Sequence, residues 1–317
     1  METSVKEHHH SGTKNYRLMA TRWFGERVTR NEDPRLLAGR GTYVDDIQPP
    51  RLLHAAFVRS PHAHARIIRI DTAQTKALPG VAAVFTAADL PAAIRGPLPR
   101  LIPHPTLIHH KTQVALAGTF VHHVGEPIVM VVAESRYIAE DGADLVEAEF
   151  EPLPAVVDLE DAAGPGSPTV HEDLDTNVAA HHTQRVGNVD EAWLRAPHVF
   201  RERFVMDRGS SSPIETRGIV ALWDARTRYL TVWDSTQAPI RIRNFLSQLF
   251  SLPQSSIRVI APDIGGGFGP KIMMCYPEEI LIPHAAMALG LPVKWIEVRR
   301  EHFVATNHER QQIHDAE

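Results

Sequence analysis

The chain is poor in cysteine: Cys275 is the only one among 317 residues. An internal disulfide framework is therefore excluded, and a cytoplasmic setting is favoured, because disulfide-rich chains belong to oxidising compartments. A single thiolate also cannot hold an iron–sulfur cluster, which normally takes four cysteine ligands. A cluster of this kind would have to be carried by another chain.

Long apolar runs and runs of like charge are absent as well. No apolar stretch approaches the roughly 20 residues needed to cross a bilayer, and the polar start lacks the apolar core of a signal peptide. The net charge of −5 is mild and the Lys and Arg residues are scattered, which gives no electrostatic footprint for nucleic acid. We therefore expect neither a membrane span nor a nucleic-acid partner, in a chain of about two domains.

The first residues also lack pattern. Residues 1–18 are polar and unpatterned, and a second methionine, Met19, stands just before the first patterned stretch. Residues 1–20 are predicted to be a disordered extension. The three histidines at 8–10 are predicted not to form a metal site, because a flexible tail holds no coordination geometry.

Hydrophobic patterning predicts a first domain over residues 21–160. The run at 127–133 (PIVMVVA) is typical of a buried strand, and Ser135 is a plausible N-cap for a helix at 138–146. With a strand at 147–150, this order indicates an α/β layer. Further strands are expected at 53–57, 66–70 and 81–85, a short helix at 72–78, and loop at 90–112.

The Gly/Pro/Ser stretch at 161–168 (DAAGPGSP) predicts a linker over 161–179, followed by a second domain over 180–317. In that domain strands are expected at 219–223, 229–233, 257–260, 293–298 and 311–317, and helices at 240–250 and 277–289. Pro277 suits the first turn of the second helix, Gly290 stands past its end, and Pro283 should kink it. Because a domain seldom ends inside a patterned element, this second domain is expected to be incomplete.

The strongest local signal is residues 264–271 (IGGGFGPK), which follow the strand at 257–260. Four glycines in five residues let a backbone approach a ligand closely, and successive free N–H groups form an anion-binding nest. A dinucleotide fingerprint would need glycine at Pro270, and a phosphate-binding Walker loop would also need Ser or Thr at Ile272, so both patterns fail. On the residues alone, a tight turn and an anion-binding loop remain open.

Other candidate residues favour structural roles. His62 and His64 stand two apart without an evident third ligand, and the pairs His109-His110 and His122-His123 should diverge in an extended chain. Glu278 and Glu279 open a helix, where carboxylates favour the dipole. Cys275 is expected to be a buried, inert thiol.

Taken in order, these segments resemble the xanthine oxidase, aldehyde oxidase and carbon monoxide dehydrogenase large-chain family. STQAP at 235–239, a helix, and then IRVIAPDIGGGFGPK are similar to its molybdopterin-binding domain. DPRLLAGRGTYVDDI at 33–47, VRSPHAHARI at 58–67, LPGVAAVFTAADL at 78–90 and the segment 124–158 are similar to its a/b hammerhead domain. The resemblance implies an α/β and α+β fold, a hammerhead domain followed by the first part of a molybdopterin-binding domain.

The resemblance also implies site residues. Gln237 matches the glutamine whose amide hydrogen-bonds an oxo ligand of molybdenum. Gly267, Phe268 and Gly269 match the loop that lies against the metal and the pterin, with Phe268 walling the site. The family's catalytic glutamate and most pterin contacts lie beyond the sequence given, so no catalytic residue and no metal ligand is assigned. Ile272 stands where purine-oxidising relatives carry a glutamate, which argues against a purine substrate.

The implied cofactor is molybdenum–molybdopterin, in its cytosine dinucleotide form. The implied partners are an iron–sulfur subunit, an FAD subunit and a further C-terminal molybdopterin-binding portion. The implied reaction is hydroxylation of an aldehyde, an N-heterocycle or a similar small molecule, with water as the oxygen source. Three alternatives stay open: an inactive truncated fragment, an enzyme split over two chains, and a non-catalytic anion-binding module.

Overall fold

The computed structural model describes residues 25, 27–100, 103–272 and 275–317. The predicted extension at 1–20, with its three histidines, lies outside these residues. The chain divides into two compact units, Met1–Gly41 and Thr42–Glu317. In the first, the short helix α1 (Asp33–Leu37) has proline in its first turn and buries none of its residues. The elements that follow all belong to the second unit.

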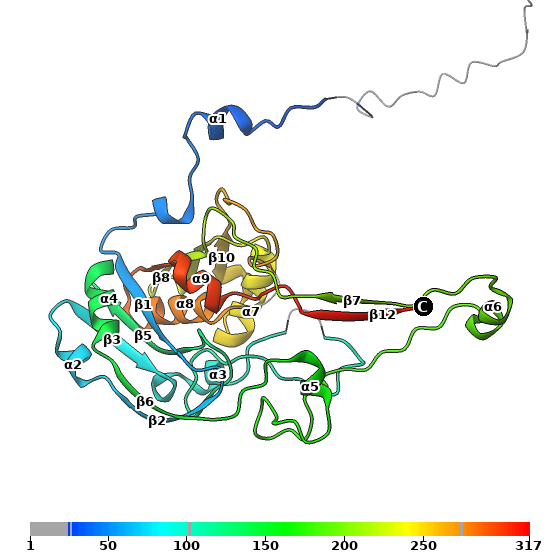
Figure 1. The fold of residues 1–317 in the computed structure, drawn as a ribbon. Coiled ribbons are helices and arrows are strands. Elements are labelled where there is room, and N and C mark those ends of the chain that lie inside the picture. Colours follow the sequence, from blue (N-terminus) through cyan, green and yellow to red (C-terminus); the bar gives the residue numbers. More distant parts are fainter. Residues whose placement is uncertain (1–24, 26, 101–102, 273–274) are drawn as a thin grey trace, which may run out of the picture. The chain divides into compact units, whose positions relative to one another are not determined.

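A seven-stranded sheet forms the centre of the second unit, in the order β10-β9-β8-β11-β1-β5-β3 (Figure 1). Its strands are β1 (Leu53–Arg59), β3 (Val81–Thr86), β5 (Pro127–Ala133), β8 (Gly218–Asp224), β9 (Tyr229–Asp234), β10 (Ile257–Ile260) and β11 (Val293–Ile296). Each was predicted from the pattern of apolar residues. β1 runs parallel to β11, with Leu53 opposite Val293. The sequence regions on either side of the predicted linker therefore share one sheet.

A smaller three-stranded sheet has the order β4-β2-β6, with β2 (Ala65–Asp71), β4 (Phe120–Val121) and β6 (Glu147–Pro152). The predicted helix after β5 is confirmed as α4 (Arg136–Asp144), and the Ser135 hydroxyl accepts a hydrogen bond from the N–H of Ile138 at 3.2 Å. The prediction of one α/β layer is wrong, because β5 and β6 lie in different sheets. β5 is buried on both faces, whereas β6 keeps alternate residues exposed and pairs antiparallel with β2.

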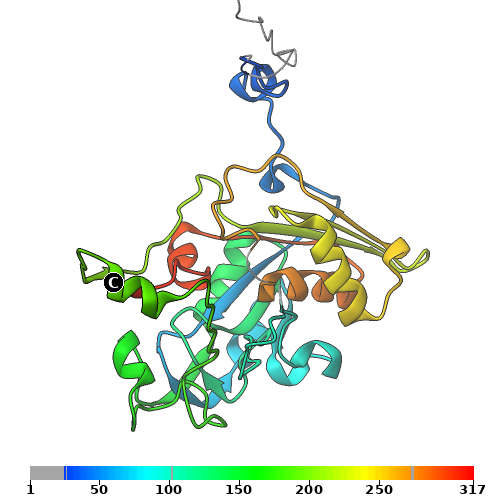
Figure 2. The ribbon, with the colours of Figure 1, turned by 90° about the vertical axis from the view of Figure 1, so that its right-hand side faces the viewer.

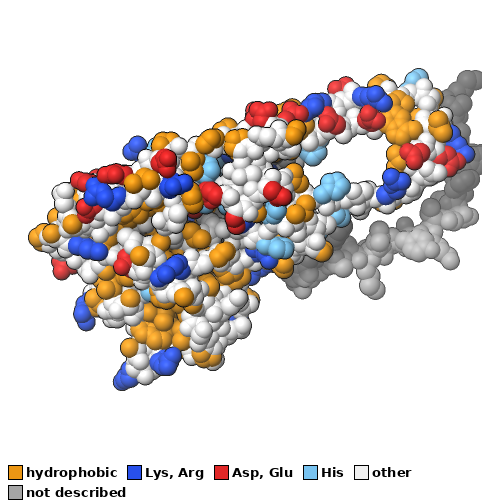
Figure 3. Space-filling view, turned by 90° about the horizontal axis from the view of Figure 1, so that it is seen from below, with side chains coloured by type: hydrophobic (Ala, Val, Ile, Leu, Met, Phe, Trp, Pro, Cys, Tyr) orange, Lys and Arg blue, Asp and Glu red, His pale blue; other side chains and the backbone are white. Residues whose placement is uncertain are grey.

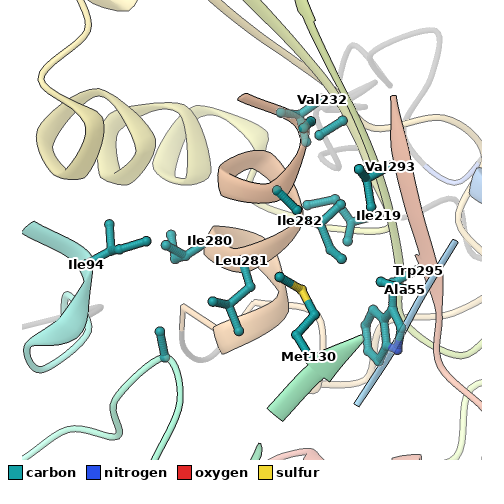
Figure 4. Packing of buried hydrophobic residues seen from close by; sticks show 14 of the residues in the cluster. Ala55, Ile94, Met130, Ile219, Val232, Ile280, Leu281, Ile282, Val293 and Trp295 are labelled. Carbon is teal, nitrogen blue, oxygen red and sulfur yellow. The ribbon is translucent and has the colours of Figure 1, made fainter. Parts of the chain in front are cut away.

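The two faces of β5 serve two hydrophobic clusters. Met130 and Val132 belong to the larger cluster, together with residues of α8 (Pro277–Leu289), as Figure 4 shows for Met130, Ile280 and Leu281. Val129 and Val131 belong to the second cluster. Burial of both faces explains why this strand is a continuous apolar run rather than an alternating one.

α8 and α7 (Pro239–Phe250) both contribute to the larger cluster and lie on the same face of the sheet (Figure 2). Both helices have proline in the first turn, where its missing N–H costs nothing. α8 ends as predicted at Gly290, whose φ of +63° is the left-handed conformation that glycine adopts readily. The kink expected at Pro283 stays a prediction.

The remaining elements are short. They are the helices α2 (Ala73–Ala77), α3 (Ala92–Arg95), α5 (Leu159–Ala163), α6 (Val189–Arg195) and α9 (Arg299–Ala305), the 3-10 turns η1 (Val44–Asp46), η2 (Ala87–Asp89) and η3 (Gln254–Ser256), and the ribbon strands β7 (Glu202–Met206) and β12 (Gln312–Ala316). The loop predicted at 90–112 is wrong at α3, a single helical turn that buries Ile94. The predicted C-terminal strand is confirmed as β12 and pairs with β7, which the pattern missed because all five residues of β7 are exposed.

None of the helices in the described part of the chain combines the length and the apolar character needed to cross a bilayer. On the face drawn in Figure 3, acidic, basic and apolar side chains are interspersed.

The predicted linker at 161–179 leads to a test of the shared sheet. Pro165 and Gly166 are exposed, so limited proteolysis should cut near them first. Because β1 pairs with β11 across the cut, the two fragments should stay associated in gel filtration and separate in denaturant. Fragments that separate without denaturant would contradict the shared sheet. First cleavage inside β5 or α4 would contradict the linker.

Candidate cofactor-binding site

The glycine-rich loop after β10 has a strained, outward-facing backbone. Gly266 and Gly269 each have a φ of +102°, and Phe268 has a φ of +48° although it is not glycine. The Phe268 side chain is 73% exposed, so it does not serve core packing. Other turns of this chain also hold non-glycine residues at a similar φ, so the exposed aromatic ring, and not the backbone conformation, sets this loop apart from a simple turn.

Gln237 lies directly against this loop. Its backbone N–H donates to the carbonyl oxygen of Lys271 at 3.0 Å. A Cβ atom added to Gly267 would lie 2.2 Å from Gln237 Oε1, so the loop approaches the amide to a distance that only glycine permits. The structure thus brings Gln237 and Gly267 together and places Phe268 and Gly269 next along the same loop.

The polar groups of the loop are available to a ligand. Gly265 N–H donates to Glu215 and Ile272 N–H donates to Gly269. Among the described residues, the four N–H groups at 266–269 have no hydrogen-bond partner, and neither has the exposed amide of Gln237. Consecutive unpaired N–H groups beside a neutral amide fit an anionic or oxo ligand. The residues present therefore fit the cofactor that the sequence implies.

Glu215 holds the base of the loop. A single oxygen, Oε2, accepts from the Ser235 hydroxyl at 2.7 Å, from Gly265 N–H at 2.8 Å and from Lys271 Nζ at 2.8 Å. The Lys271 side chain is fully buried, and burial lowers its pKa even though Glu215 opposes the shift. Glu215 therefore ties the end of β9 to both ends of the loop. No local sequence pattern marks Glu215, because its three partners lie 20 to 56 residues away.

A buried ion network lies behind this site. Arg217 contacts Glu278 at 3.0 Å and Glu297 at 2.6 Å, and its guanidinium lies 4.0 Å from the ring centre of Tyr276. Glu278 and Glu279 both lie in the first turn of α8, as predicted. Glu279 caps the helix, since its carboxyl oxygen accepts the N–H of Tyr276, whereas the Glu278 carboxylate also pairs with Arg217 and Arg59, partners that the prediction did not include.

Several minor predictions are settled by the same geometry. Cys275 is buried, and burial raises the pKa of its thiol well above the ordinary value, as expected for an inert thiol. His62 packs its ring on Phe150, with centroids 5.0 Å apart, in a structural role as predicted. Ile272 is half-buried at the end of the loop.

Asp234 is a buried carboxyl group at the end of β9. Its Oδ2 has no partner among the described residues. Burial raises its pKa to about 7, against the opposing charges of Arg217 and Lys271. The folded pKa therefore lies above the value of 3.8 for an unperturbed aspartate, so the stabilising contribution of the protonated form is full below about pH 4 and is lost as the pH rises through 7.

We expect Asp234→Asn to raise the free energy of unfolding at pH 8 by on the order of 1–3 kcal/mol, because it removes the cost of ionising a buried carboxyl. The gain should shrink at pH 5, where the wild-type group is protonated in the folded state. Urea unfolding at both pH values measures this, with the exposed Asp141→Asn as the matched control. Destabilisation by Asp234→Asn at pH 8 would show that the ionised carboxylate is the stable form.

Comparison with known families matches the chain in two consecutive segments. Residues 38–154 match the aldehyde oxidase and xanthine dehydrogenase a/b hammerhead domain, and residues 170–317 match the molybdopterin cofactor-binding domain. Both matches fall in the order that the sequence resemblance gave. The linker boundaries at 161–179 stay a prediction.

Individual relatives agree with these matches. The chain is 42% identical over 289 residues to the nicotine 6-hydroxylase large subunit of Paenarthrobacter nicotinovorans, covering 91% of this chain and 35% of the relative. It is 41% identical over 294 residues to the carbon monoxide dehydrogenase large chain of Afipia carboxidovorans, covering 89% and 35%. The quinoline 2-oxidoreductase structure from Pseudomonas putida 86 superposes with a TM-score of 0.82 at 38% identity, covering 91% and 36%.

The chain thus spans about 35% of the length of the curated relatives it matches. Three findings lead to one assignment. The two domain matches adjoin in family order, close relatives match over nine tenths of the chain, and a solved structure has the same fold. The chain belongs to the molybdenum hydroxylase large-chain family of xanthine oxidase, aldehyde oxidase and carbon monoxide dehydrogenase, and comprises the a/b hammerhead domain followed by part of the molybdopterin-binding domain.

Proposed function

We propose that this chain forms part of a molybdenum hydroxylase that oxidises an aldehyde, an N-heterocycle or a similar small molecule, with water as the oxygen source. The observation that carries the proposal is the unpaired amide of Gln237, which lies against Gly267 beside four unpaired backbone N–H groups. The names of the relatives, a nicotine hydroxylase and a quinoline oxidoreductase, support an N-heterocycle. Ile272 in place of an acidic residue argues against a purine.

When bound, a molybdenum–molybdopterin cofactor would supply the two-electron oxidation and the activated oxygen. The residues of this chain would bind and orient it. The Gln237 amide would hydrogen-bond an oxygen ligand without adding charge. The N–H groups of Gly267 and Gly269 would face anionic ligands, and the exposed Phe268 ring would wall the site against water. Glu215 would keep the loop in this geometry through Gly265 and Lys271.

The rest of the machinery would lie outside these 317 residues. The catalytic carboxylate and most pterin contacts would come from a further C-terminal molybdopterin-binding portion, and none of the residues here is assigned as a base. The cofactor would be the cytosine dinucleotide form. Iron–sulfur clusters and FAD would be carried by partner subunits, since Cys275 is the only cysteine in the sequence and is buried.

The test is Gln237→Ala in the complete large chain, co-expressed with its partner subunits. Loss of a hydrogen bond to a metal ligand should lower molybdenum content or dye-linked oxidation of N-heterocycles and aldehydes by about 10–100-fold. Gly269→Val should lose more, because a branched side chain resists the φ of +102°. Gln248→Ala, an exposed glutamine on α7, is the matched control. Full molybdenum and full rate in both site variants would leave the loop as a turn only.

A non-catalytic anion-binding module is the second candidate, favoured by the same unpaired N–H groups at 266–269. The two candidate functions differ in the molybdenum content and the phosphate binding that they predict. An assembled protein that contains no molybdenum, yet binds inorganic phosphate in a way that Gly269→Val abolishes, would establish the module and reject the hydroxylase.

A further inference from the structure

Three ligand-type side chains that do not belong to the glycine loop converge at His64, His122 and Glu172. One ligand atom from each lies within 4.8 Å of the others. His64 Nε2 lies 2.9 Å from Glu172 Oε1, and His122 Nε2 lies 3.4 Å from Glu172 Oε2. No third ligand stands near His62 and His64 in the sequence, because Glu172 is 108 residues away from His64.

The hydrogen-bond acceptors around the His64 ring outnumber the N–H groups that a neutral imidazole can donate. His64 Nδ1 faces the carbonyl oxygen of Pro154 at 2.9 Å, and its Nε2 faces a carboxylate. His122 Nδ1 faces Glu126 Oε2 at 3.7 Å, and its Nε2 faces the same carboxylate of Glu172. His64 has both ring nitrogens 2.9 Å from an acceptor, whereas a neutral imidazole has only one N–H to donate. A cation bound at Nε2 would satisfy both this nitrogen and the carboxylate oxygen that faces it.

We propose that His64, His122 and Glu172 bind a divalent transition-metal ion of the zinc type. Two imidazoles and a carboxylate form a three-ligand zinc set with one open position. Zinc–ligand bonds of about 2.0–2.1 Å at a tetrahedral angle place ligand atoms roughly 3.3 Å apart. The two histidine–carboxylate distances of 2.9 and 3.4 Å, which end on the two different oxygens of Glu172, are close to this spacing, and all three ligand atoms lie within 4.8 Å of one another. The proposal is independent of the molybdenum site.

The groups around the cluster suit metal ligation. Ligating histidines usually donate their other N–H to a carbonyl or a carboxylate, which fixes the ring orientation. The carbonyl oxygen of Pro154 lies in this position for His64, at 2.9 Å. The buried Glu126 lies 3.7 Å from Nδ1 of His122 and accepts the backbone N–H of that residue at 2.6 Å. The His64 side chain is only 9% exposed. A cavity of about 810 Å³ borders both histidines and gives an entry path for the ion and water.

The site would also join segments that are distant in the sequence. His64 directly precedes β2, and His122 follows β4, in the small sheet. Glu172 lies in the predicted linker at 161–179. A bound metal would therefore pin the linker onto the small sheet, which makes linker cleavage a second, structural readout of binding.

The experiment is zinc titration of the full chain by calorimetry at neutral pH, with His8, His9 and His10 replaced by serine so that they cannot bind the ion. We expect one zinc per chain, a higher Tm, and slower proteolysis near Pro165 and Gly166. E172Q and H122N should lose all three effects, and E126Q should weaken binding by about 10–100-fold. H62N is the matched control, because His62 packs on Phe150 outside the cluster, and it should bind as the wild type does.

Cobalt provides a readout that needs no variant. If E172Q or H122N does not fold, absorption and X-ray fine structure of the cobalt-loaded wild type should show four-coordinate cobalt with two imidazole ligands. The proposal is overturned if the wild type binds no zinc at 1:1 stoichiometry, if cobalt shows no imidazole ligands, or if folded E172Q binds zinc as tightly as the wild type. The cluster would then be a pair of imidazolium–carboxylate contacts.

Discussion

Replacement of Arg217 by alanine is expected to lower the free energy of unfolding by about 3–5 kcal/mol, the cost of leaving buried charges unpaired. The Arg217 side chain is buried, and its guanidinium neutralises Glu278 and Glu297 together. Among the described residues, Glu278 would keep Arg59 as a partner, whereas Glu297 would keep His302 and the N–H of residue 217 alone. Most of the loss should therefore arise at Glu297.

Urea unfolding at pH 7 measures this loss. Glu297→Gln in the Arg217→Ala background should recover part of it, because it removes the uncompensated charge. Arg69→Ala is the matched control, since Arg69 also contacts three carboxylates, those of Asp71, Glu147 and Glu149, but is about half exposed. Surface pairs of this kind contribute little. Equal losses from the two arginine variants would show that burial of the network does not matter.

The same ion network also makes the stability of the fold fall at acid pH. Burial would raise the pKa of Glu297, but the charge of Arg217 and the hydrogen bond from His302 outweigh it and lower the pKa to about 2, from 4.5. The stabilising contribution is therefore present above pH 4.5 and is lost as the pH falls towards 2. Arg217→Ala should flatten the dependence of stability on pH in this window, which acid titration followed by circular dichroism would detect.

The parts of the fold that local patterns control could be predicted from the sequence. β5 is a run of seven buried residues, and its limits were predicted correctly. α8 begins at Pro277 and ends before Gly290, as proline and glycine chemistry requires. The site residues Gln237, Gly267, Phe268 and Gly269 came from family resemblance, and the structure places the first two in contact range. Their roles remain proposals.

The features that could not be predicted depend on pairing between distant residues. The parallel contact of β1 with β11 joins residues 240 positions apart, and both are ordinary apolar strands in the sequence. Glu278 looked like a helix-start carboxylate, and only the fold places it beside Arg59 and Arg217. His64 and Glu172 likewise form a cluster only when the linker lies on the small sheet. Patterns along the sequence indicate which residues are buried and where turns lie, but they do not identify which distant residues pair in the fold.

Gly267→Ala is expected to reproduce the loss of molybdenum or activity that Gln237→Ala causes, about 10–100-fold. Its φ is not positive, so alanine adds no backbone strain. The added Cβ would lie 2.2 Å from Gln237 Oε1 and 2.4 Å from Gln237 Cδ, so the amide must move away from the loop. The whole effect of this substitution should therefore pass through Gln237.

A double-mutant cycle in the complete large chain tests this directly. If Gly267→Ala acts by displacing the amide, the Gly267→Ala, Gln237→Ala double variant should lose no more than Gln237→Ala alone, because the amide can be removed only once. Gly96→Ala is the matched control, since a Cβ there meets nothing within 4 Å and its φ is negative. Losses that multiply would mean that the added methyl group also disturbs the cofactor directly, independently of Gln237. A Gly267→Ala variant with full molybdenum and full rate would contradict the site, because the amide would then be free to leave its place without consequence.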